Sequence, residues 1–253
     1  MAQARFFVRP INAGTVRLAG REARHLAAVR RLAPGDTVSL FDGRGRLASA
    51  TIERVSSTSV QLHVENVEET KPTPENRIVL AAAVAKGERF DWLVSRCTEL
   101  GVDHLCPVLF ERTVKRPGSA NLLRRYERLA IEAAKQCGRL YLPRIDSPCE
   151  LLELMGSLKS DYPRAMWLMG CLSAEATSLM ALDWSGRDVV VFVGPEGGFS
   201  PDERTLLADH QARRVRLTGT TLRVETAAVA FCSILSAQRQ AACDQAESDK
   251  PVD

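Results

Sequence analysis

From Ile78 onward, short apolar segments alternate with segments of helical periodicity, and this alternation limits the possible folds more than any other feature of the sequence. The apolar segments include IVLAAAVAK, HLCPVLF and DVVVFVG, which are short and rich in β-branched residues, as buried strands are. Strands that alternate with helices pair in parallel, because each helix returns the chain to the same end of the sheet. We therefore expect an α/β domain with a largely parallel sheet and helices on both faces.

Residues 1 to about 70 have a different pattern, in which short strand segments are separated by turns. The strand segments are TVRLAG, DTVSLFDGRGRLASATIERV and SVQLHVENV, and Asp42-Gly43 inside the second is a strong hairpin signal. One segment of helical periodicity, REARHLAAVRRL, interrupts them, and we expect His25 within it to be structural. The pattern predicts a small β-barrel with one helix.

A stretch without periodicity separates the two patterns. EETKPTPENR, residues 68–77, contains two prolines and a cluster of charges, which is typical of a linker. We therefore place the barrel domain at residues 1–72 and the α/β domain at residues 73–243. The polar end of the chain, residues 244–253, is expected to be disordered.

Composition limits the cellular setting. Apolar residues make up 45% and charged residues 26% of the 253 residues, as in ordinary globular proteins. The N-terminal segment lacks the apolar core of a secretory signal, and no apolar run approaches the roughly 20 residues that span a bilayer. The seven cysteines include no C-x-x-C pair, which argues against a zinc site and a disulfide framework. We expect a cytoplasmic protein that binds no metal.

Arginines are concentrated in the first 46 residues. This segment holds nine arginines against three acidic residues, although the net charge of the whole chain is only +3. Such asymmetry predicts that the N-terminal part binds a polyanion, and the alternative is a solvated arginine-rich face.

A glycine-rich loop lies where one buried strand passes into a helix. VGPEGGFSPDE, residues 193–203, follows the strand segment DVVVF and precedes the helical segment PDERTLLADH. Such loops often hold a ligand, because glycine lets backbone N–H groups approach it closely. The loop lacks the lysine of a P-loop, the G-x-G-x-x-G spacing of a dinucleotide fold and the G-x-S-x-G of a hydrolase. On this loop alone, a purely structural turn is the alternative.

A second segment, LTGTTLRVETAAVAF at residues 217–231, again runs from strand to glycine-bearing loop to helix. Two such loops can meet at one edge of a parallel sheet and enclose an adenine-containing ligand. With both loops, the chain resembles the SPOUT superfamily of S-adenosylmethionine-dependent RNA methyltransferases, and within it the bacterial 16S ribosomal RNA uridine N3-methyltransferases. The resemblance extends over nearly the whole chain through ARFF, HLAAVRRLAPGD, AKGERFDWLVSRCTELGV, ERT and AIEAAKQCGRLYLPRI.

The resemblance implies a PUA-like N-terminal β-barrel that binds RNA, and a C-terminal SPOUT α/β domain whose last part forms a trefoil knot. It also implies a homodimer, which would account for a closing helix, residues 224–242, that is apolar on several sides. The implied methyl donor is S-adenosyl-L-methionine, with S-adenosyl-L-homocysteine as product. By position, the donor-binding residues would be Leu168, Met169, Gly170, Gly194, Pro195, Glu196, Gly197, Gly198, Leu217, Gly219, Thr220 and Leu222.

The implied reaction is methylation of N3 of a uridine, uridine-1498, in the 16S ribosomal RNA of the small subunit. Loss of the N3 proton spreads negative charge onto the flanking carbonyl oxygens, which a fixed guanidinium would stabilise. Arg223 is the first candidate, with an ion pair to Glu225 or Glu196 as its alternative. Arg5 is the second, with surface positioning as its alternative. We expect Glu196 to hold the loop rather than act as general base, and the base stays unassigned.

The arginine-rich segment would supply the contacts to RNA phosphates. The candidates are Arg5, Arg9, Arg24, Arg30 and Arg31. Whether free RNA or the assembled small subunit is the substrate stays open.

Two positions depart from the family pattern. Where many relatives carry L-G-x-R-[IV]-L-R, this chain carries LTGTTLR, so Thr218 and Thr220 replace a glycine and an arginine. This departure keeps open a non-catalytic RNA-binding or ribosome-assembly protein that retains the knotted fold. A nucleotide-dependent oxidoreductase is disfavoured, because the dinucleotide fingerprint is missing.

Overall fold

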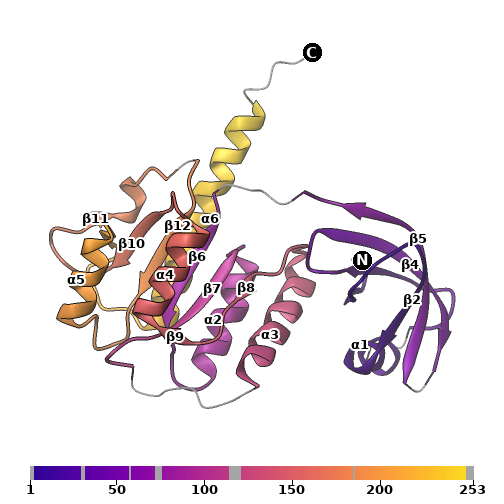
Figure 1. The fold of residues 1–253 in the computed structure, drawn as a ribbon. Coiled ribbons are helices and arrows are strands. Elements are labelled where there is room, and N and C mark those ends of the chain that lie inside the picture. The colour runs from indigo at the N-terminus through magenta and orange to yellow at the C-terminus, as the bar shows by residue number, and fades with distance from the viewer. Residues whose placement is uncertain are drawn as a thin grey trace. The chain divides into compact units, whose positions relative to one another are not determined.

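The computed structural model of the chain describes residues 3–29, 32–56, 58–71, 76–113, 121–184 and 186–248 (Figure 1). The chain divides into two compact units, Met1–Pro72 with Ile131–Leu142, and Thr73–Ala130 with Pro143–Asp253. Part of the second predicted domain, Ile131–Leu142, thus belongs to the first unit. Within the described residues, no helix is both long and apolar enough to cross a membrane.

The first unit contains a curved five-stranded sheet in the order β1-β3-β4-β5-β2. Strand β1 pairs in parallel with β3, and the remaining pairs are antiparallel. The helix α1 continues directly into a π-helical turn, residues 25–29. The elements are β1 (Arg5–Phe7), β2 (Gly14–Ala19), α1 (Gly20–Arg24), β3 (Thr37–Phe41), β4 (Arg46–Val55) and β5 (Ser59–Glu69).

Alternation of apolar and polar residues builds the core of this unit. In β5, Val60, Leu62 and Val64 are buried while the residues between them are exposed. This two-residue period places one face of the sheet on the core and the other in solvent. The predicted hairpin at Asp42-Gly43 is confirmed, and the Asp42 carboxylate accepts the backbone N–H of Arg44 at 2.7 Å.

The end of helix α3 (Leu122–Cys137) and the residues after it complete the first unit. The Lys135 ammonium donates to the Glu22 carboxylate at 3.0 Å, and the other oxygen of Glu22 accepts the backbone N–H of Phe7. The backbone N–H of Leu142 donates to the carbonyl of Gly43 at 3.0 Å. These contacts join segments far apart in the sequence, so sequence periodicity could not predict them.

The second unit contains an eight-stranded sheet in the order β11-β13-β10-β12-β6-β7-β8, with β9 paired to β7. Every pair of strands in this sheet is parallel, which confirms the predicted sheet type. The strands are β6 (Ile78–Ala83), β7 (His104–Leu109), β8 (Arg144–Ile145), β9 (Cys149–Glu150), β10 (Met166–Gly170), β11 (Thr177–Ser178), β12 (Val189–Val193) and β13 (Arg213–Arg216).

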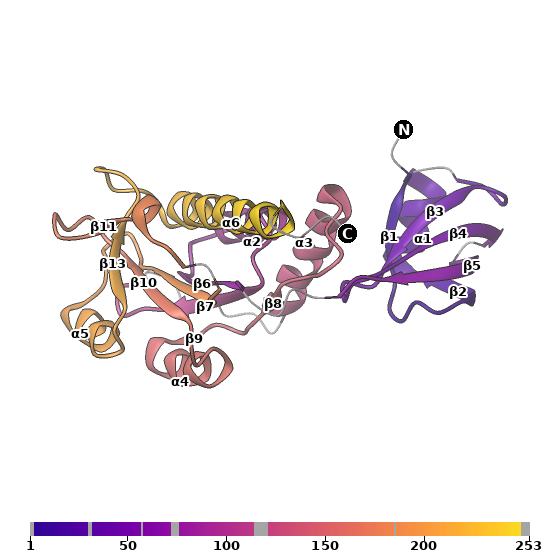
Figure 2. The ribbon, with the colours of Figure 1, turned by 90° about the horizontal axis from the view of Figure 1, so that it is seen from above.

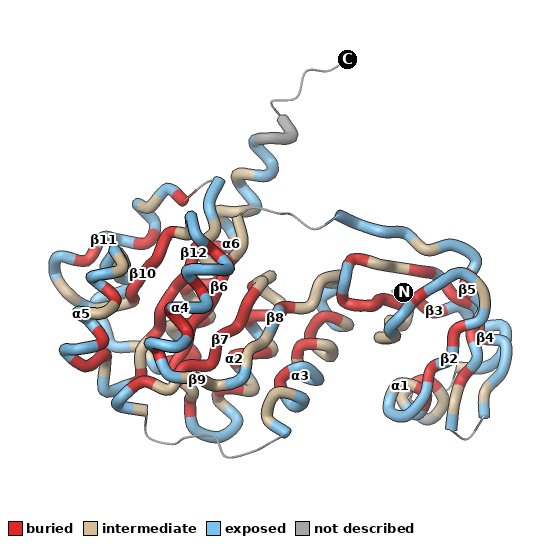
Figure 3. Tube along the Cα trace, in the orientation of Figure 1, coloured by how far each residue is buried: buried red, intermediate tan, exposed pale blue. Residues whose placement is uncertain are grey.

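Helices cover both faces of this sheet, as the alternating pattern predicts. Helices α2 (Glu88–Glu99) and α6 (Val224–Ser248) pack on one face, and α4 (Leu151–Asp161) and α5 (Pro201–Asp209) lie on the other (Figure 2). Strands β6 and β12 are therefore buried along their whole length (Figure 3). A short 3₁₀ turn, Leu179–Ala181, follows β11.

An ion pair fixes the start of the two central strands. The Asp188 carboxylate, just before β12, accepts the backbone N–H of Arg77, just before β6, at 2.9 Å. The Arg77 guanidinium donates to the same carboxylate at 2.7 Å, and this hydrogen bond raises the pKa of Arg77. Backbone and side chain of one residue thus hold β6 and β12 in register.

The predicted disorder from residue 244 onward is wrong for residues 244–248, which belong to helix α6. The helix continues through Ser248, whereas disorder was expected from Asp244 onward. Residues 240–248 contain no glycine or proline, and the amide of Gln240 donates to Asp244 one turn later at 2.7 Å. Residues 249–253 lie outside the described part of the chain.

Candidate functional site

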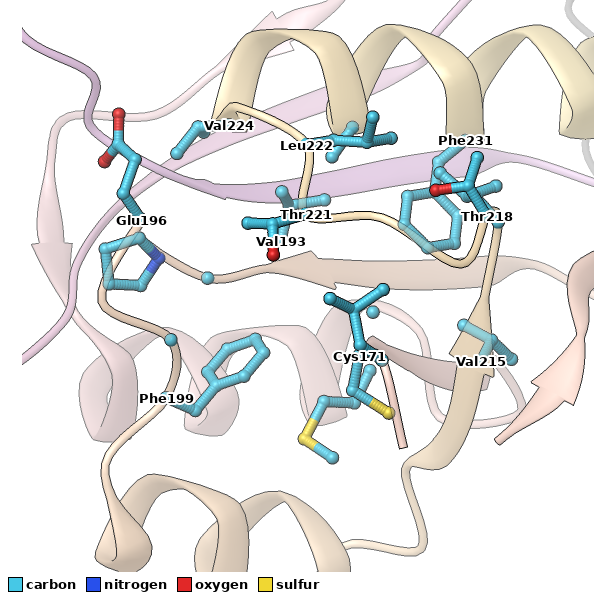
Figure 4. Close-up of a pocket in the computed structure, with 18 of the residues that line it drawn as sticks. Cys171, Val193, Glu196, Phe199, Val215, Thr218, Thr221, Leu222, Val224 and Phe231 are labelled. Atoms are coloured by element: carbon cyan, nitrogen blue, oxygen red, sulfur yellow. The ribbon is translucent and has the colours of Figure 1, made fainter. Parts of the chain in front are cut away.

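Three neighbouring strands of the second unit end at one edge of the sheet and form a pocket there. Strands β13, β10 and β12 are adjacent and parallel, so their carboxyl ends lie together. The loops that follow them enclose a cavity of about 390 Å³ (Figure 4). Parallel α/β sheets bind their ligands at such an edge.

Most of the residues predicted to bind the donor line this pocket. They are Met169, Gly170, Gly194, Pro195, Glu196, Gly197, Gly198, Leu217, Thr220 and Leu222. Leu168 does not line it, because its side chain is buried inside the sheet. Gly219 does not line it either, and it is exposed.

Several lining residues were not predicted from the sequence. Apolar walls come from Leu172, Val193, Phe199, Val224 and Phe231, of which Phe231 lies inside α6. The further lining residues are Cys171, Arg204, Val215, Thr218, Thr221 and Ala227. The apolar run of α6 gave a signal for burial, but it could not show which side chain faces a pocket.

Two glycines are required by close approach of aromatic rings. A Cβ atom at Gly194 would lie 3.0 Å from the ring of Phe199, and one at Gly170 would lie 2.9 Å from the ring of Phe231. Phe199 itself packs edge-on against Phe110, at 5.2 Å between ring centroids. Larger residues at either glycine would displace a ring or fill the pocket.

The glycine loop is tied to the rest of the unit by charged side chains. The Glu196 carboxylate accepts from the Arg89 guanidinium, on α2, at 2.9 Å. Glu225, at the start of α6, is 8% exposed and lies 3.9 Å from the same guanidinium. Arg89 therefore lies between two carboxylates from the two predicted loops. Glu196 thus connects the loop to α2 through Arg89.

A second group of contacts anchors the far end of the loop. Ser200 caps helix α5 by accepting the backbone N–H of Glu203, whose carboxylate accepts the N–H of Ser200 at 2.8 Å. The other oxygen of Glu203 accepts the backbone N–H of Glu111 at 2.7 Å. Arg112 donates to the carbonyl of Gly197 at 2.6 Å. The segment after β7 thus fixes the loop after β12.

The two threonines that depart from the family pattern stabilise their own loop. The Thr218 hydroxyl donates to the carbonyl of Thr220 at 3.0 Å and accepts its backbone N–H at 3.3 Å. Such a local bond is a common way for threonine to order a turn. These hydrogen bonds stabilise the turn although residue 218 is not a glycine.

Arg223 lies just before α6 and is exposed. It does not line the pocket, and the described residues offer it no ion-pair partner. The expected alternative, a pair with Glu196 or Glu225, is wrong because Arg89 occupies that place.

The arginines of the first unit differ in how accessible their side chains are to a bound RNA. Arg24 is exposed. Arg9 donates to the carbonyl of Asp42 at 2.6 Å, so it holds the hairpin. Arg5 is partly buried, and its Nη1 has no hydrogen-bond partner within the described residues. Arg30 and Arg31 lie outside the described residues. Contacts of these arginines with RNA stay a prediction.

Comparison with known proteins identifies the family. The RNA methyltransferase domain family matches residues 71–236, and the RNA methyltransferase PUA domain family matches residues 18–65. A protein of Synechocystis, the ribosomal RNA small subunit methyltransferase E, is 32% identical over 216 residues, which are 84% of this chain and 70% of that protein. The chain belongs to the ribosomal RNA small subunit methyltransferase E family.

Solved structures of methyltransferases share the fold. A methyltransferase of Legionella pneumophila, crystallised with bound S-adenosylmethionine, is 27% identical with a TM-score of 0.84, and 94% of this chain and 98% of that one are covered. The family member of Neisseria gonorrhoeae, also bound to S-adenosylmethionine, is 26% identical with a TM-score of 0.83 and the same coverage. The resemblance to a family of RNA methyltransferases is confirmed, and the first unit is a PUA-like domain.

Replacing Arg89 by methionine should loosen the glycine loop. Exposed ion pairs contribute about 0.2–1 kcal/mol, so amide exchange in residues 194–200 should accelerate roughly 1.4- to fivefold. Hydrogen–deuterium exchange with mass spectrometry measures this rate. The control is Arg96→Met on the same helix, which removes a pair with Glu99 at 2.7 Å. Equal exchange in both variants would show that Arg89 does not hold the loop.

Proposed function

We propose that this chain transfers a methyl group from S-adenosyl-L-methionine to N3 of a uridine in 16S ribosomal RNA of the small subunit. The observation that carries the proposal is the pocket at the carboxyl ends of β13, β10 and β12, built by the two glycine loops. Two relatives of the same fold hold S-adenosylmethionine in their structures.

The pocket fits a donor of this kind. Its volume of about 390 Å³ lies within the roughly 300–1,000 Å³ of small-molecule sites. Leu172, Val193 and Leu222 give it apolar walls suited to an adenine ring, and Figure 4 shows Leu222 and Val193 on neighbouring segments. The glycine loop exposes backbone groups suited to the polar ends of the donor.

The protein's main contribution is alignment. When bound, the donor supplies an electrophilic methyl group attached to a sulfonium. Holding two reactants in line can lower a barrier by up to about 7–11 kcal/mol, provided that the site does not move. Arg89 and Arg112 hold the glycine loop through Glu196 and the Gly197 carbonyl, and Ser200 fixes its end. These residues position the loop and need not touch the acceptor.

Arg223 is the residue we propose to stabilise the acceptor. Uracil N3 becomes nucleophilic only when its proton leaves, and the charge then spreads onto the carbonyl oxygens. Arg223 lies beside the donor loop and is not engaged by Glu196 or Glu225. Its guanidinium can therefore donate to these oxygens. Glu196 is held by Arg89, so we assign no general base, and solvent can take the proton.

Helix α6 supports a homodimer. Val229, Ala230 and Ile234 are only half-buried in the single chain, although all three are apolar. A helix that is apolar on several sides is covered on several sides. We propose that a second copy of the chain packs on this helix, and that the two donor loops form the trefoil knot implied by the resemblance.

The first unit would orient the RNA. Arg24 is exposed in a segment rich in arginine, and phosphate contacts of this kind fix the register of an RNA without reading its sequence. Arg5, a partly exposed residue of β1, is the second proposed contact. Binding by such contacts weakens steeply as salt rises.

Filling the pocket should abolish donor binding. Gly194→Trp places a large ring where a Cβ alone would lie 3.0 Å from Phe199. Calorimetric titration with S-adenosylmethionine should show micromolar binding by the wild type and none by the variant. Gly156→Trp is the matched control, because a Cβ at Gly156 meets no atom within 4 Å. Undiminished binding by a folded Gly194→Trp variant would place the donor elsewhere.

Removing Arg223 should slow methyl transfer without weakening donor binding. Loss of one group that stabilises transition-state charge lowers kcat by about 10²–10³. Single-turnover methylation of small ribosomal subunits by Arg223→Ala measures this effect, and calorimetry measures the donor. The control is Arg216→Ala on β13, which is also exposed. An unchanged rate would exclude Arg223 from the reaction. Donor binding without turnover by the wild type would instead favour the non-catalytic RNA-binding protein.

A further inference from the structure

Three potential metal ligands converge at the opposite edge of the parallel sheet from the donor pocket. They are the Nε2 of His104, the Sγ of Cys106 and the Oδ2 of Asp146, which all lie within 4.8 Å of one another. His104 and Cys106 are each 1% exposed, and Asp146 is half-buried. His104 begins β7, so the cluster lies at the amino ends of the strands.

The register of the sheet brings these side chains together. His104 and Cys106 are two residues apart on β7 and therefore point to the same face. Strand β8 pairs in parallel with β7, with Arg144 beside His104 and Ile145 beside Leu105. The next residue, Asp146, donates its backbone N–H to the carbonyl of Leu105 at 3.1 Å. Its carboxylate is thus placed beside both side chains.

Side chains outside the cluster contact two of the three potential ligands and orient them. The Tyr162 hydroxyl lies 3.0 Å from Nδ1 of His104, on the far side of the ring from the cluster. The Arg144 guanidinium donates to Oδ1 of Asp146 at 2.9 Å, which leaves Oδ2 for the cluster. Metal-binding histidines and carboxylates are held in this way by hydrogen bonds from their other atoms.

The inner atoms can share either a proton or a metal ion. When Nδ1 of His104 donates its proton to the Tyr162 oxygen, Nε2 carries a lone pair. That lone pair faces the Asp146 Oδ2 at 2.7 Å and the Cys106 Sγ at 3.3 Å. Two acceptors this close repel each other unless a proton or a metal ion lies between them.

We propose that His104, Cys106 and Asp146 bind one Zn²⁺ ion, with water as its fourth ligand. Nitrogen, thiolate sulfur and carboxylate oxygen are the ligands that zinc prefers. Ligand atoms at about 2.0–2.3 Å from a tetrahedral zinc lie roughly 3.3–3.7 Å apart. The distances from Sγ to Nε2 and Oδ2, 3.3 and 3.8 Å, are already close to this range. Only the 2.7 Å distance from Nε2 to Oδ2 must widen.

Binding is a ligand exchange that releases protons. The Cys106 thiol proton, and any proton shared by His104 and Asp146, leave to solvent as zinc takes their place. Asp146 is only half-buried, so the cluster can be reached from solvent on its side. The cluster contains no donor-pocket residue, so the ion would join β7 to β8 and take no part in methyl transfer. The proposal is therefore independent of the proposed function.

Cobalt titration tests the site in the full-length protein. The background carries Cys137→Ala and Cys243→Ala, because these two cysteines are exposed and could bind metal on their own. After treatment with a chelator, the protein is titrated with Co²⁺ and then with Zn²⁺. We expect the protein to bind one Co²⁺ per chain and to show a thiolate-to-cobalt charge-transfer band. Equimolar Zn²⁺ should displace the Co²⁺ and abolish the band. Chelation should also lower the Tm.

Cys106→Ala in the same background should lose the charge-transfer band, and Cys106→Ser makes the same comparison should the alanine variant fail to fold. The matched control is Cys171→Ala, which lies at the donor pocket and should keep the band. Folded protein without stoichiometric binding at micromolar metal would overturn the proposal and leave a proton shared by His104 and Asp146. A band that survives the loss of the Cys106 sulfur would also overturn it.

Discussion

Parallel pairing of β13, β10 and β12 is the constraint on which the proposed donor site depends. Because the three strands are adjacent and run in one direction, the loops that follow them open at one edge of the sheet. The loops after β12 and β13 each run from a strand to a helix, and the loop after β10 runs to β11. Together they enclose a cavity, and the two glycines in it are needed because Phe199 and Phe231 approach their backbones closely. The site therefore forms because these three strands are neighbours in the sheet.

Ion pairs of charged side chains then hold these loops in place. Arg89 connects α2 to Glu196 in the loop after β12 and lies 3.9 Å from Glu225 at the start of α6. Alignment of donor and acceptor is the main contribution that a methyltransferase can make, and alignment requires that the loops do not move. The interactions that stabilise this unit thus also serve the proposed reaction, while Arg223 stays available for the acceptor.

The sequence predicts the parts of this structure that depend on local pattern. The run VVVFV is apolar without alternation, so a strand buried on both faces follows from it directly. The glycines at positions 194, 197 and 198 likewise indicate a loop between a strand and a helix. By contrast, the pair of Arg89 with Glu196 joins residues 107 positions apart, and no local pattern indicates which charges meet. The cluster of His104, Cys106 and Asp146 was missed for the same reason, since its residues come from β7 and from the position after β8.

Nucleoside analysis of ribosomal RNA tests the central claim most directly. Small subunits from cells that lack this protein would be incubated with it and with S-adenosylmethionine labelled in the methyl group, and their 16S RNA digested for mass spectrometry. Naked 16S RNA treated in parallel shows whether the assembled subunit is required. The account predicts labelled N3-methyluridine, at one site per RNA molecule. Label in a different nucleoside, or none from protein that binds the donor, would contradict it.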